Sequence, residues 1–240
     1  MLQRPAAWRS PSGAKLADPT ASAFDAVPGA LVLRDGPLLV WDKPPDLPTS
    51  GRSLDDDDCL QFHLMRAHGA MVWAVHQLDA DTSGLNVFVT AKCAVAPTAA
   101  RMQRPEARKR YLAVVHGVPS WDATVVDAPI GYVDARSLGV APEGKPARTE
   151  LRVRTRGPAH SLLEAELKTG RTHQIRIHLQ HLGLSLVGEE WYRETPCLAH
   201  PRQALHAWRL DGLEPGPLEA RFPPDLMGLA ARLGCADPSL

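Results

Sequence analysis

The sequence lacks long hydrophobic runs, is poor in cysteine and carries no excess of charge of either sign. No apolar stretch approaches the length of a membrane helix, so we expect a soluble protein without a membrane partner. Residues 1–24 contain no continuous apolar segment and make a poor secretory signal. The four cysteines are Cys59, Cys93, Cys197 and Cys235, and none of them forms a CxxC pair. A zinc site and a disulfide framework are therefore not indicated, and a reducing cytoplasm is the expected location.

The formal net charge of zero neither supports nor excludes a nucleic-acid partner, because phosphate binding needs only a local basic surface. Basic residues crowd one short stretch, which contains Arg101, Arg104, Arg108, Lys109 and Arg110. Two readings of this stretch stay open, a solvated helix face and a set of phosphate contacts.

An acidic run, Asp55 to Asp58, opens a segment that is typical of a helix over residues 53–69. Ser53 would cap this helix, and the acids would lie in its first turn, where the helix dipole favours negative charge. Leu60, Leu64 and Ala67 would form its buried stripe.

Apolar alternation predicts that strands dominate the chain. We expect a hairpin over 31–44 that turns at Asp35-Gly36-Pro37, and further strands over 85–91, 110–119, 149–157, 160–170 and 204–210. Helices are predicted over 173–182, with Gly183 as the C-cap, and over 222–234. Residues 141–148 are expected to form a long surface loop. The pattern indicates an α+β fold, with a mostly antiparallel mixed sheet as its core and with flanking helices and loops.

The segment Val75–Lys92 is the most informative for chemistry. It places Asp79 between an apolar approach and the turn Thr82-Ser83-Gly84, and then enters a strand. Turn hydroxyls and amides can hold a carboxylate at a rim, where it can serve as a nucleophile or a base. Three more polar patches follow, at residues 109–113, 169–178 and 188–192.

Taken in order, these patches resemble the RluA-type family of pseudouridine synthases, whose motifs read HRLDxxTSGL, KxY, GRTHQIRxH and GDxxY. The resemblance covers about residues 30 to 225. Asp79 falls on the catalytic aspartate of the family, Tyr111 on its active-site tyrosine and Arg176 on the arginine that pairs with the aspartate. Lys43-Pro44 and the stretch 144–147 resemble two further family segments.

Two positions depart from the family pattern. Gln77 stands where the family usually has an arginine that helps to hold the RNA backbone, so hydrogen bonding is kept while a phosphate-pairing charge is lost. Glu189 stands where an aspartate is usual, and the carboxylate is kept.

The resemblance implies an enzyme that isomerises specific uridines in structured ribosomal or transfer RNA to pseudouridine. The base would be flipped out, its glycosidic bond cleaved, and the rotated base reattached through C5. No cofactor, nucleotide cofactor or metal is implied, and RNA is the expected partner of a monomer. Residues 30–240 would form the catalytic domain and 1–29 a leader that is poorly structured or packed on the body, with no separate N-terminal RNA-binding domain.

Besides Asp79, Tyr111 and Arg176, the residues expected to bind substrate or support the site are His76, Gln77, Thr82, Arg110, Arg171 and Leu163. We expect Trp191 and Tyr192 to be core aromatics. His173, His178 and His181 suggest a metal site, but no carboxylate or cysteine nearby completes a ligand set, so structural or RNA-contacting roles are favoured.

Two alternatives remain at the sequence level. The segment Asp79–Thr82 resembles the DxD opening of dehalogenase-type phosphatases, but the strand pattern does not suggest the Rossmann-like sheet that these proteins need. The main rival is a non-catalytic RNA-binding module or RNA-folding chaperone on the same scaffold. Gln77 is the one feature that favours it.

Overall fold

A computed structural model describes residues 21–53, 56–193, 200–213 and 215–240. Of the predicted leader, 1–29, residues 1–20 lie outside the described residues. Its last part contains the short 3-10 helix η1 (Ala21–Phe24). Phe24 and Val27 are buried in one cluster with Trp41, so the chain from residue 21 packs on the body.

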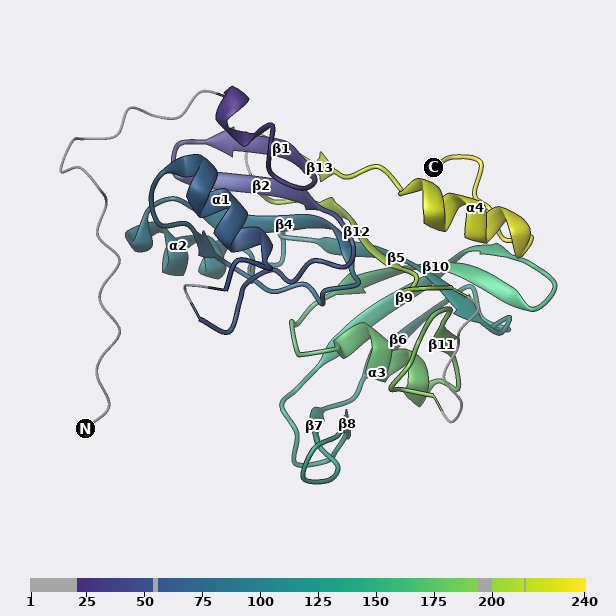
Figure 1. The fold of residues 1–240 in the computed structure, drawn as a ribbon. Helices are drawn as coiled ribbons and strands as arrows, with labels where there is room; N and C mark the ends of the chain where they lie inside the picture. The colour runs from purple at the N-terminus through teal and green to yellow at the C-terminus, as the bar shows by residue number, and fades with distance from the viewer. Residues whose placement is uncertain (1–20, 54–55, 194–199, 214) are drawn as a thin grey trace.

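Within the described residues, eleven strands form one sheet, with eight of them in a continuous path (Figure 1). In spatial order the path is β1 (Ala30–Asp35), β2 (Leu38–Lys43), β4 (Ser83–Val89), β12 (Leu205–Leu210), β5 (Lys109–His116), β10 (His160–Leu167), β9 (Arg148–Arg156) and β6 (Ala123–Asp127). Three short strands pair beside it, β3 (Trp73–Ala74), β11 (Ser185–Leu186) and β13 (Leu218–Glu219). A separate hairpin, β7 (Ile130–Tyr132) and β8 (Leu138–Val140), extends from the body.

All pairings in the large sheet are antiparallel except that of β4 with β12. The described helices are α1 (Leu60–His68), α2 (Val95–Arg101), α3 (Gln174–His181) and α4 (Pro224–Arg232), with a 3-10 turn η2 (Lys92–Ala94) before α2. The α+β fold and its mostly antiparallel sheet are therefore confirmed.

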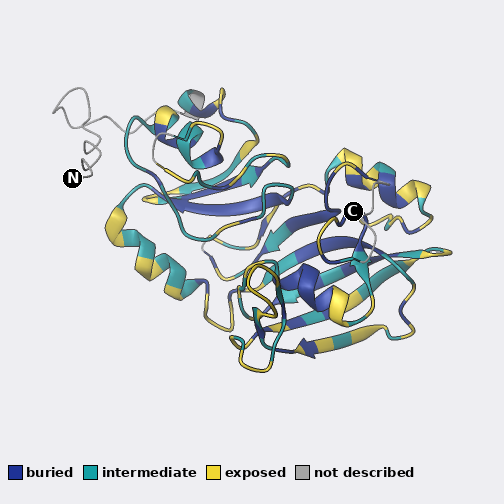
Figure 2. Cartoon of the chain, turned by 60° about the horizontal axis from the view of Figure 1, so that its bottom comes forward, coloured by how far each residue is buried: buried dark blue, intermediate teal, exposed yellow. Residues whose placement is uncertain are grey.

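Alternating side chains of the strands form cores on both faces of the sheet, as the two-residue period of a strand requires. On β5, Tyr111, Ala113 and Val115 face α3, where they pack with Ile175 and Leu179. The intervening residues of β5 pack against α4 in a second cluster that contains Leu112, Val114, Leu226, Leu229 and Ala230. Figure 2 shows the result, with buried strands at the centre and exposed residues along the outer sides of the helices. The two helices α3 and α4 thus cover opposite faces.

The sequence located most of these elements. The hairpin over 31–44, the strands and the helix beginning near residue 173 are confirmed, although most bounds shift by one to three residues. Gly183 adopts a left-handed φ of 71°, as a helix C-terminal glycine should. Residues 141–147 form the predicted loop apart from a single bridge at Lys145.

The helix predicted from Ser53 is wrong in its first part, because α1 begins only at Leu60. The amides of Leu60 and Gln61 donate to the carbonyls of Pro48 and Thr49, so a returning loop supplies the acceptors there. Asp56 accepts hydrogen bonds from the backbone amides of Arg52 and Asp58 and holds a turn instead of a helix. Asp55 lies outside the described residues, and Asp56, Asp57 and Asp58 precede the helix.

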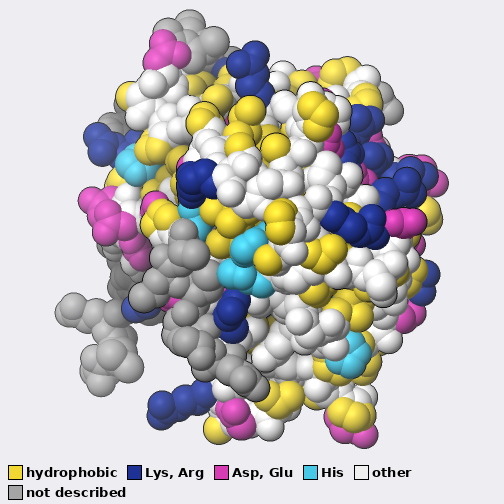
Figure 3. All heavy atoms as spheres, turned by 90° about the vertical axis from the view of Figure 1, so that its right-hand side faces the viewer, with side chains coloured by type: hydrophobic (Ala, Val, Ile, Leu, Met, Phe, Trp, Pro, Cys, Tyr) yellow, Lys and Arg dark blue, Asp and Glu magenta, His cyan; other side chains and the backbone are white. Residues whose placement is uncertain are grey.

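Charges of both signs are spread over the face of the molecule that Figure 3 shows. On the side shown in Figure 3, lysine and arginine side chains alternate with hydrophobic and acidic ones and form no continuous basic field, in keeping with the zero net charge. No helix among the described residues is long and apolar enough to cross a membrane.

Candidate active site

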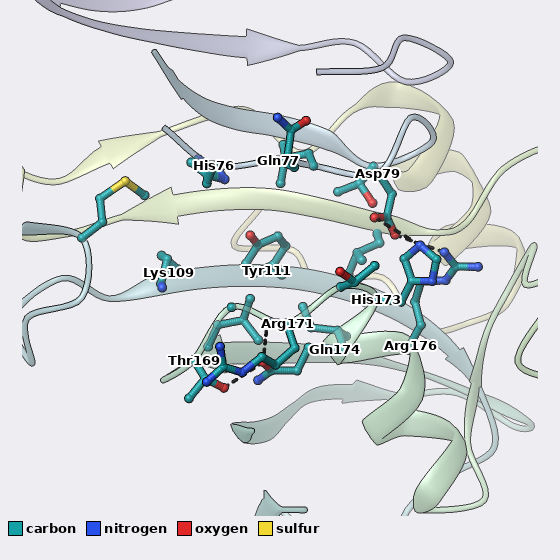
Figure 4. Close-up of a pocket in the computed structure, with 18 of the residues that line it drawn as sticks. His76, Gln77, Asp79, Lys109, Tyr111, Thr169, Arg171, His173, Gln174 and Arg176 are labelled. Carbon is teal, nitrogen blue, oxygen red and sulfur yellow. Dashed lines mark hydrogen bonds and ion pairs between the residues drawn. The ribbon is translucent and has the colours of Figure 1, made fainter. Parts of the chain in front are cut away.

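A pocket of about 640 Å³ lies where the loop before β4, the start of β5, the end of β10 and the start of α3 meet. Figure 4 shows the side chains that point into it from these four segments. Asp79 and Arg176 lie at one end, Tyr111 near the middle, and Lys109 and His76 toward the other end. The volume falls in the range of small-molecule sites.

The loop that carries Asp79 is fixed by hydrogen bonds on both sides of the carboxylate. Before it, the amide of Leu78 donates to Oγ1 of Thr49 at 2.9 Å. After it, the amide of Thr82 closes a turn onto the carbonyl of Asp79 at 3.1 Å. Thr49 is itself held by a 2.9 Å hydrogen bond to Asn86 of β4. Asp79 is therefore presented at the pocket by an ordered backbone.

Lys43 connects this loop to the end of β2. Its ammonium group is fully buried and donates to the carbonyls of Pro44, Leu47 and Ala80 at 2.7 to 2.8 Å. Burial lowers the pKa of Lys43 to about 7, with the positive charge of Arg202 acting in the same direction. All three donors of the lysine are satisfied, so the group serves as a rigid internal anchor next to Asp79.

Arg176 contacts Asp79 from the first turn of α3. Its Nη1 lies 3.1 Å from Oδ2 of Asp79. Nε and Nη2 donate to the two carboxylate oxygens of Glu189 at 2.9 and 2.7 Å, a bidentate pair. Arg176 and Glu189 are 3% and 1% exposed, so the guanidinium is fixed before any substrate arrives.

Arg176 and Glu189 change the pKa values of each other. Burial alone would lower the pKa of Arg176, but the hydrogen bonds and negative charges of Glu189 and Asp79 outweigh it and raise the pKa. Burial would raise the pKa of Glu189, but Arg176 and the amides of Trp191 and Tyr192 lower it. Both groups therefore remain ionised at neutral pH.

Tyr111 of β5 reaches the pocket from a buried position. Burial, and then the negative charge of Asp79, raises the pKa of its hydroxyl well above the ordinary value. The side chain is therefore a neutral phenol, able to stack on a ring and to exchange a proton through its hydroxyl.

His173 precedes α3 in a left-handed backbone conformation, with φ at 55°. Its Nδ1 lies 2.8 Å from the hydroxyl of Tyr192, and its Nε2 lies 3.8 Å from Oδ1 of Asp79. Burial lowers the pKa of His173 despite the opposing effect of Asp79. The ring is therefore mostly neutral at pH 7, and a direct ion pair with Asp79 is not its normal state.

The charged residues of the pocket lining are mostly basic. Among the described residues that line it, Asp79 is the single acid, beside Lys109, Lys168, Arg171 and Arg176. Lys168 pairs with Glu166 and Glu150, and Nε of Arg171 donates to the carbonyl of Pro146. Lys168 and Arg176 are thus compensated by acids outside the lining, and Lys109 and Arg171 add further positive charge near Asp79, which suits an anionic substrate.

Residues 37–181 match the family model described as RNA pseudouridylate synthase. The chain belongs to this family. Similar curated proteins include a ribosomal large subunit pseudouridine synthase D of Nitrosomonas europaea, 36% identical over 80% of this chain and 60% of that protein. An uncharacterized RNA pseudouridine synthase of Chloroflexus aurantiacus is 44% identical over 59% of this chain and 45% of that protein. The chain therefore spans about half to three fifths of the length of these two relatives.

The pseudouridylate synthase fold is also seen in a solved structure of the human RNA pseudouridylate synthase domain containing 4. It superposes with a TM-score of 0.72 over 89% of this chain and 95% of that one, at 23% identity. At that identity the likeness supports the fold alone.

The structure brings most of the predicted residues of this pseudouridine synthase family member together. Seven of the nine line the one pocket: His76, Gln77, Asp79, Thr82, Tyr111, Arg171 and Arg176. His76 supports the loop by accepting a hydrogen bond from the amide of Val87. Gln77 is exposed at the lip, where its Oε1 accepts from Ser50 at 3.2 Å. Arg171 lines the pocket and also holds the loop at Pro146.

Arg110 and Leu163 do not line this pocket. The guanidinium of Arg110 pairs with Asp211 at 2.6 Å and lies 3.7 Å from Glu166, because strand alternation turns it away from Tyr111. Leu163 is fully buried in the core beneath the pocket, packed in the same cluster as Tyr111. Direct substrate contact by either residue is therefore not supported by the geometry.

Sequence reasoning missed the supports of the site more than the site itself. Thr49 and Asn86 belong to no motif that points to a site. Their hydrogen bond forms because the fold places β4 beside the loop that contains Thr49, so the sequence alone does not predict it. At position 189 the sequence predicts only that a carboxylate is kept, whereas the structure shows that Glu189 holds Arg176. Lys109 and Lys168 were not singled out as pocket residues, yet both line it.

The prediction that Trp191 and Tyr192 are core aromatics holds for Tyr192, which is 8% exposed, but not for Trp191, which is 67% exposed. Of the three histidines named from the sequence, His173 lies at the pocket and His178 in the interior. His178 is buried between Thr149 and the carbonyl of Ala128. Among the described residues, no group of three His, Cys, Asp or Glu side chains is placed to hold a metal ion.

Proposed function

We propose that this chain isomerises uridine to pseudouridine in RNA, with Asp79 as the catalytic carboxylate. The observation that carries the proposal is the 3.1 Å contact between Asp79 and Arg176 on the wall of a pocket that Tyr111 also lines. A non-catalytic RNA-binding module would not require a carboxylate held by a buried arginine beside a neutral tyrosine. Within this proposal residues 30–240 form the catalytic domain, preceded by the leader 1–29.

The reaction begins when a uridine leaves the RNA stack and enters the pocket. Asp79 then acts at the ribose, as a nucleophile or as the base that starts glycal formation. Arg176 directs the carboxylate of Asp79. Its guanidinium stays protonated because the negative charge of Glu189 stabilises the positive charge in the interior. The ring of Tyr111 stacks on the freed uracil, which turns until C5 faces the ribose. A C1′–C5 bond then replaces the C1′–N1 bond, C5 loses its proton to solvent, and N1 takes up a proton.

Thr82 offers a further contact to the bound nucleotide. Its side chain lines the pocket and is 2% exposed, and Oγ1 has no hydrogen-bond partner among the described residues. A buried hydroxyl normally finds a partner, so a polar atom of the substrate is the natural one.

RNA as the partner agrees with the excess of lysine and arginine in the lining. Lys109 lines the pocket, while Arg104 and Arg108 are exposed beside it along the chain, so the basic stretch offers phosphate contacts outside the pocket. Among possible substrates we favour ribosomal over transfer RNA, because relatives from several bacteria carry the name ribosomal large subunit pseudouridine synthase D. We further propose a cytoplasmic monomer, in keeping with the free thiols of Cys59, Cys93 and Cys235.

The test is tritium release from RNA that carries 5-tritiated uridine. The wild type should release tritium, and Asp79→Asn should reduce release to the limit of detection while keeping the folded state. Asp81→Asn is the matched control, because Asp81 lies two residues away and does not line the pocket. Full activity of Asp79→Asn would refute the assignment.

RNA binding by the wild type without tritium release would identify a chaperone instead of an enzyme. Ribosomal and transfer RNA transcripts should be compared in the same assay. Pseudouridine mapping of cellular RNA, with and without the gene, then identifies the modified position. A loss confined to transfer RNA would overturn the preference for ribosomal RNA.

A further inference from the structure

Trp191 is an exposed tryptophan at the edge of the candidate active site. Its residue surface is 67% exposed, whereas the neighbouring Tyr192 is 8% exposed. Large aromatic side chains contribute much to stability when buried, so an indole that is two-thirds exposed gains little from burial in the free protein. A surface role is therefore the more economical explanation.

The exposed ring is held in place by the same residues that form the site. The amide of Trp191 donates to Oε1 of Glu189 at 3.0 Å. Cζ of Arg176 lies 5.2 Å from the centre of the indole, within cation–π range. The ring of His173 lies 5.4 Å away at an interplanar angle of 61°. These contacts fix the orientation of the indole without covering it.

The location of Trp191 restricts what can bind to it. Arg176 and His173 both line the pocket that contains Asp79, so a group that covers the indole lies directly beside the pocket. An extruded nucleotide leaves flanking bases that have lost a stacking partner at that place. Aromatic side chains stack on any nucleobase, and the cations of the pocket attract the backbone that carries these bases.

We propose that Trp191 is a stacking platform for an RNA base that flanks the extruded uridine. The inference rests on the proposed function and deepens it, because it assigns a residue to the part of the substrate that stays outside the pocket. The role is one of binding and positioning. The chemistry remains with the residues inside the pocket.

The test compares three variants in the tritium-release assay with a transcript of large-subunit ribosomal RNA. Trp191→Ala and Trp191→Leu should raise KM about 5- to 150-fold, the range that corresponds to loss of one base–aromatic stack. Trp191→Phe retains an aromatic face and should stay within about threefold of the wild type. All three should leave kcat nearly unchanged, because stacking on a flanking base stabilises the ground state and the transition state alike.

Tyr132→Ala is the matched control, since Tyr132 is 71% exposed on the hairpin strand β7 and does not line the pocket. If Trp191 merely supports Arg176, Trp191→Ala will lower kcat and leave KM unchanged, which overturns the proposal. An unchanged KM and kcat in Trp191→Leu also overturns it. An inactive wild type would refute the proposed function itself, so the two failures are distinguishable.

A second readout is independent of turnover. Stacking quenches tryptophan fluorescence, so addition of the same transcript to the Asp79→Asn protein should quench the emission. The Asp79→Asn, Trp191→Phe double variant should lose that component of the quenching. Equal quenching in both proteins would count against contact between Trp191 and a base.

Discussion

At the scale of single residues, Glu189 determines how Arg176 can act. Two of the arginine nitrogens are engaged by the carboxylate of Glu189, and a third is left for Asp79. The same carboxylate accepts the amides of Trp191 and Tyr192, so it fixes both the arginine and the aromatic pair. One buried side chain therefore controls the geometry of the reactive carboxylate and of its surroundings.

Glu189→Gln should lower the free energy of unfolding by about 3–5 kcal/mol, because it leaves a buried guanidinium without a full counter-charge. We also expect a lower kcat, since Arg176 would lose its fixed orientation toward Asp79. Urea unfolding and tritium release measure the two effects. Glu190→Gln is the control, because Glu190 is exposed and its substitution should change stability by no more than about 0.5 kcal/mol. Equal stability of the two variants would contradict this account.

Individual residues also show what motif order can predict. The ordered motifs placed Asp79, Tyr111 and Arg176 at one site, and the structure brings these three to one pocket. Arg110 stands next to Tyr111 in the same motif, yet it pairs with Asp211, which is distant in sequence. Trp191 was expected in the core by its residue type. Local sequence does not specify which distant residues a side chain contacts. The ion pair of Arg110 and the exposure of Trp191 could therefore be found only from the structure.

At the scale of elements, the parallel contact between β4 and β12 depends on Gly84. Its φ is 108°, and an added Cβ would lie 2.2 Å from the carbonyl oxygen of Ala207. Only glycine accommodates both the backbone angle and the close approach. The contact positions the start of β4, and hence the Asp79 loop, against the centre of the sheet.

Gly84→Ala should lower the free energy of unfolding by about 1–3 kcal/mol through backbone strain, and the clash at Ala207 should lower it further. Activity should fall as well, because Thr82 lies two residues before Gly84. Gly228→Ala in α4 is the control, since its added Cβ meets only the end of Arg232 at 3.7 Å. A helical glycine-to-alanine change should stabilise by about 0.5–1 kcal/mol. Thermal or urea unfolding of both variants would separate these effects, and a stable Gly84→Ala protein would refute the role of the glycine.

Strands and helices were predictable wherever the pattern of burial is regular. β5 and β10 alternate between two cores, so their residues carry a signal that can be read locally. The start of α1 carries no such signal, because its first amides are satisfied by the loop at Pro48 and Thr49. A run of acids after a serine is typical of a helix start, and tertiary hydrogen bonds overruled that preference here.

At the scale of the whole molecule, strand order creates the site. The insertion of β12 between β4 and β5 sets the distance across which Asp79 faces Tyr111, and β10 leads directly to the segment that precedes α3. Hydrophobic periodicity predicts each of these strands but says nothing about their order. The family resemblance predicted that Asp79, Tyr111 and Arg176 share one site, without predicting the strand order that brings them together, and it carried no information on the residues that support the site.

The whole fold should also lose stability in acid through two histidines that it holds neutral, the partly buried His76 and the buried His206. Burial lowers the pKa of His76 and of His206 to about 4, whereas an exposed histidine titrates near 6.5. Between these values the unfolded chain binds more protons than the folded one, so the free energy of unfolding falls as the pH drops from about 6.5 to 4. Each pKa unit corresponds to about 1.4 kcal/mol, so each histidine contributes a loss of roughly 3 kcal/mol.

His206→Gln isolates one of these contributions. His206 is 1% exposed and contacts Ser83 and Ala220 through its two ring nitrogens, so the substitution should cost about 1–3 kcal/mol at pH 7. Burial raises the pKa of Asp42 to about 6 and acts in the opposite direction over the acidic range, but equally in both proteins. The stability difference between wild type and variant should therefore shrink or reverse by pH 4. Urea unfolding across this range measures it, and a difference that stays constant with pH would show that His206 is not held neutral by the fold.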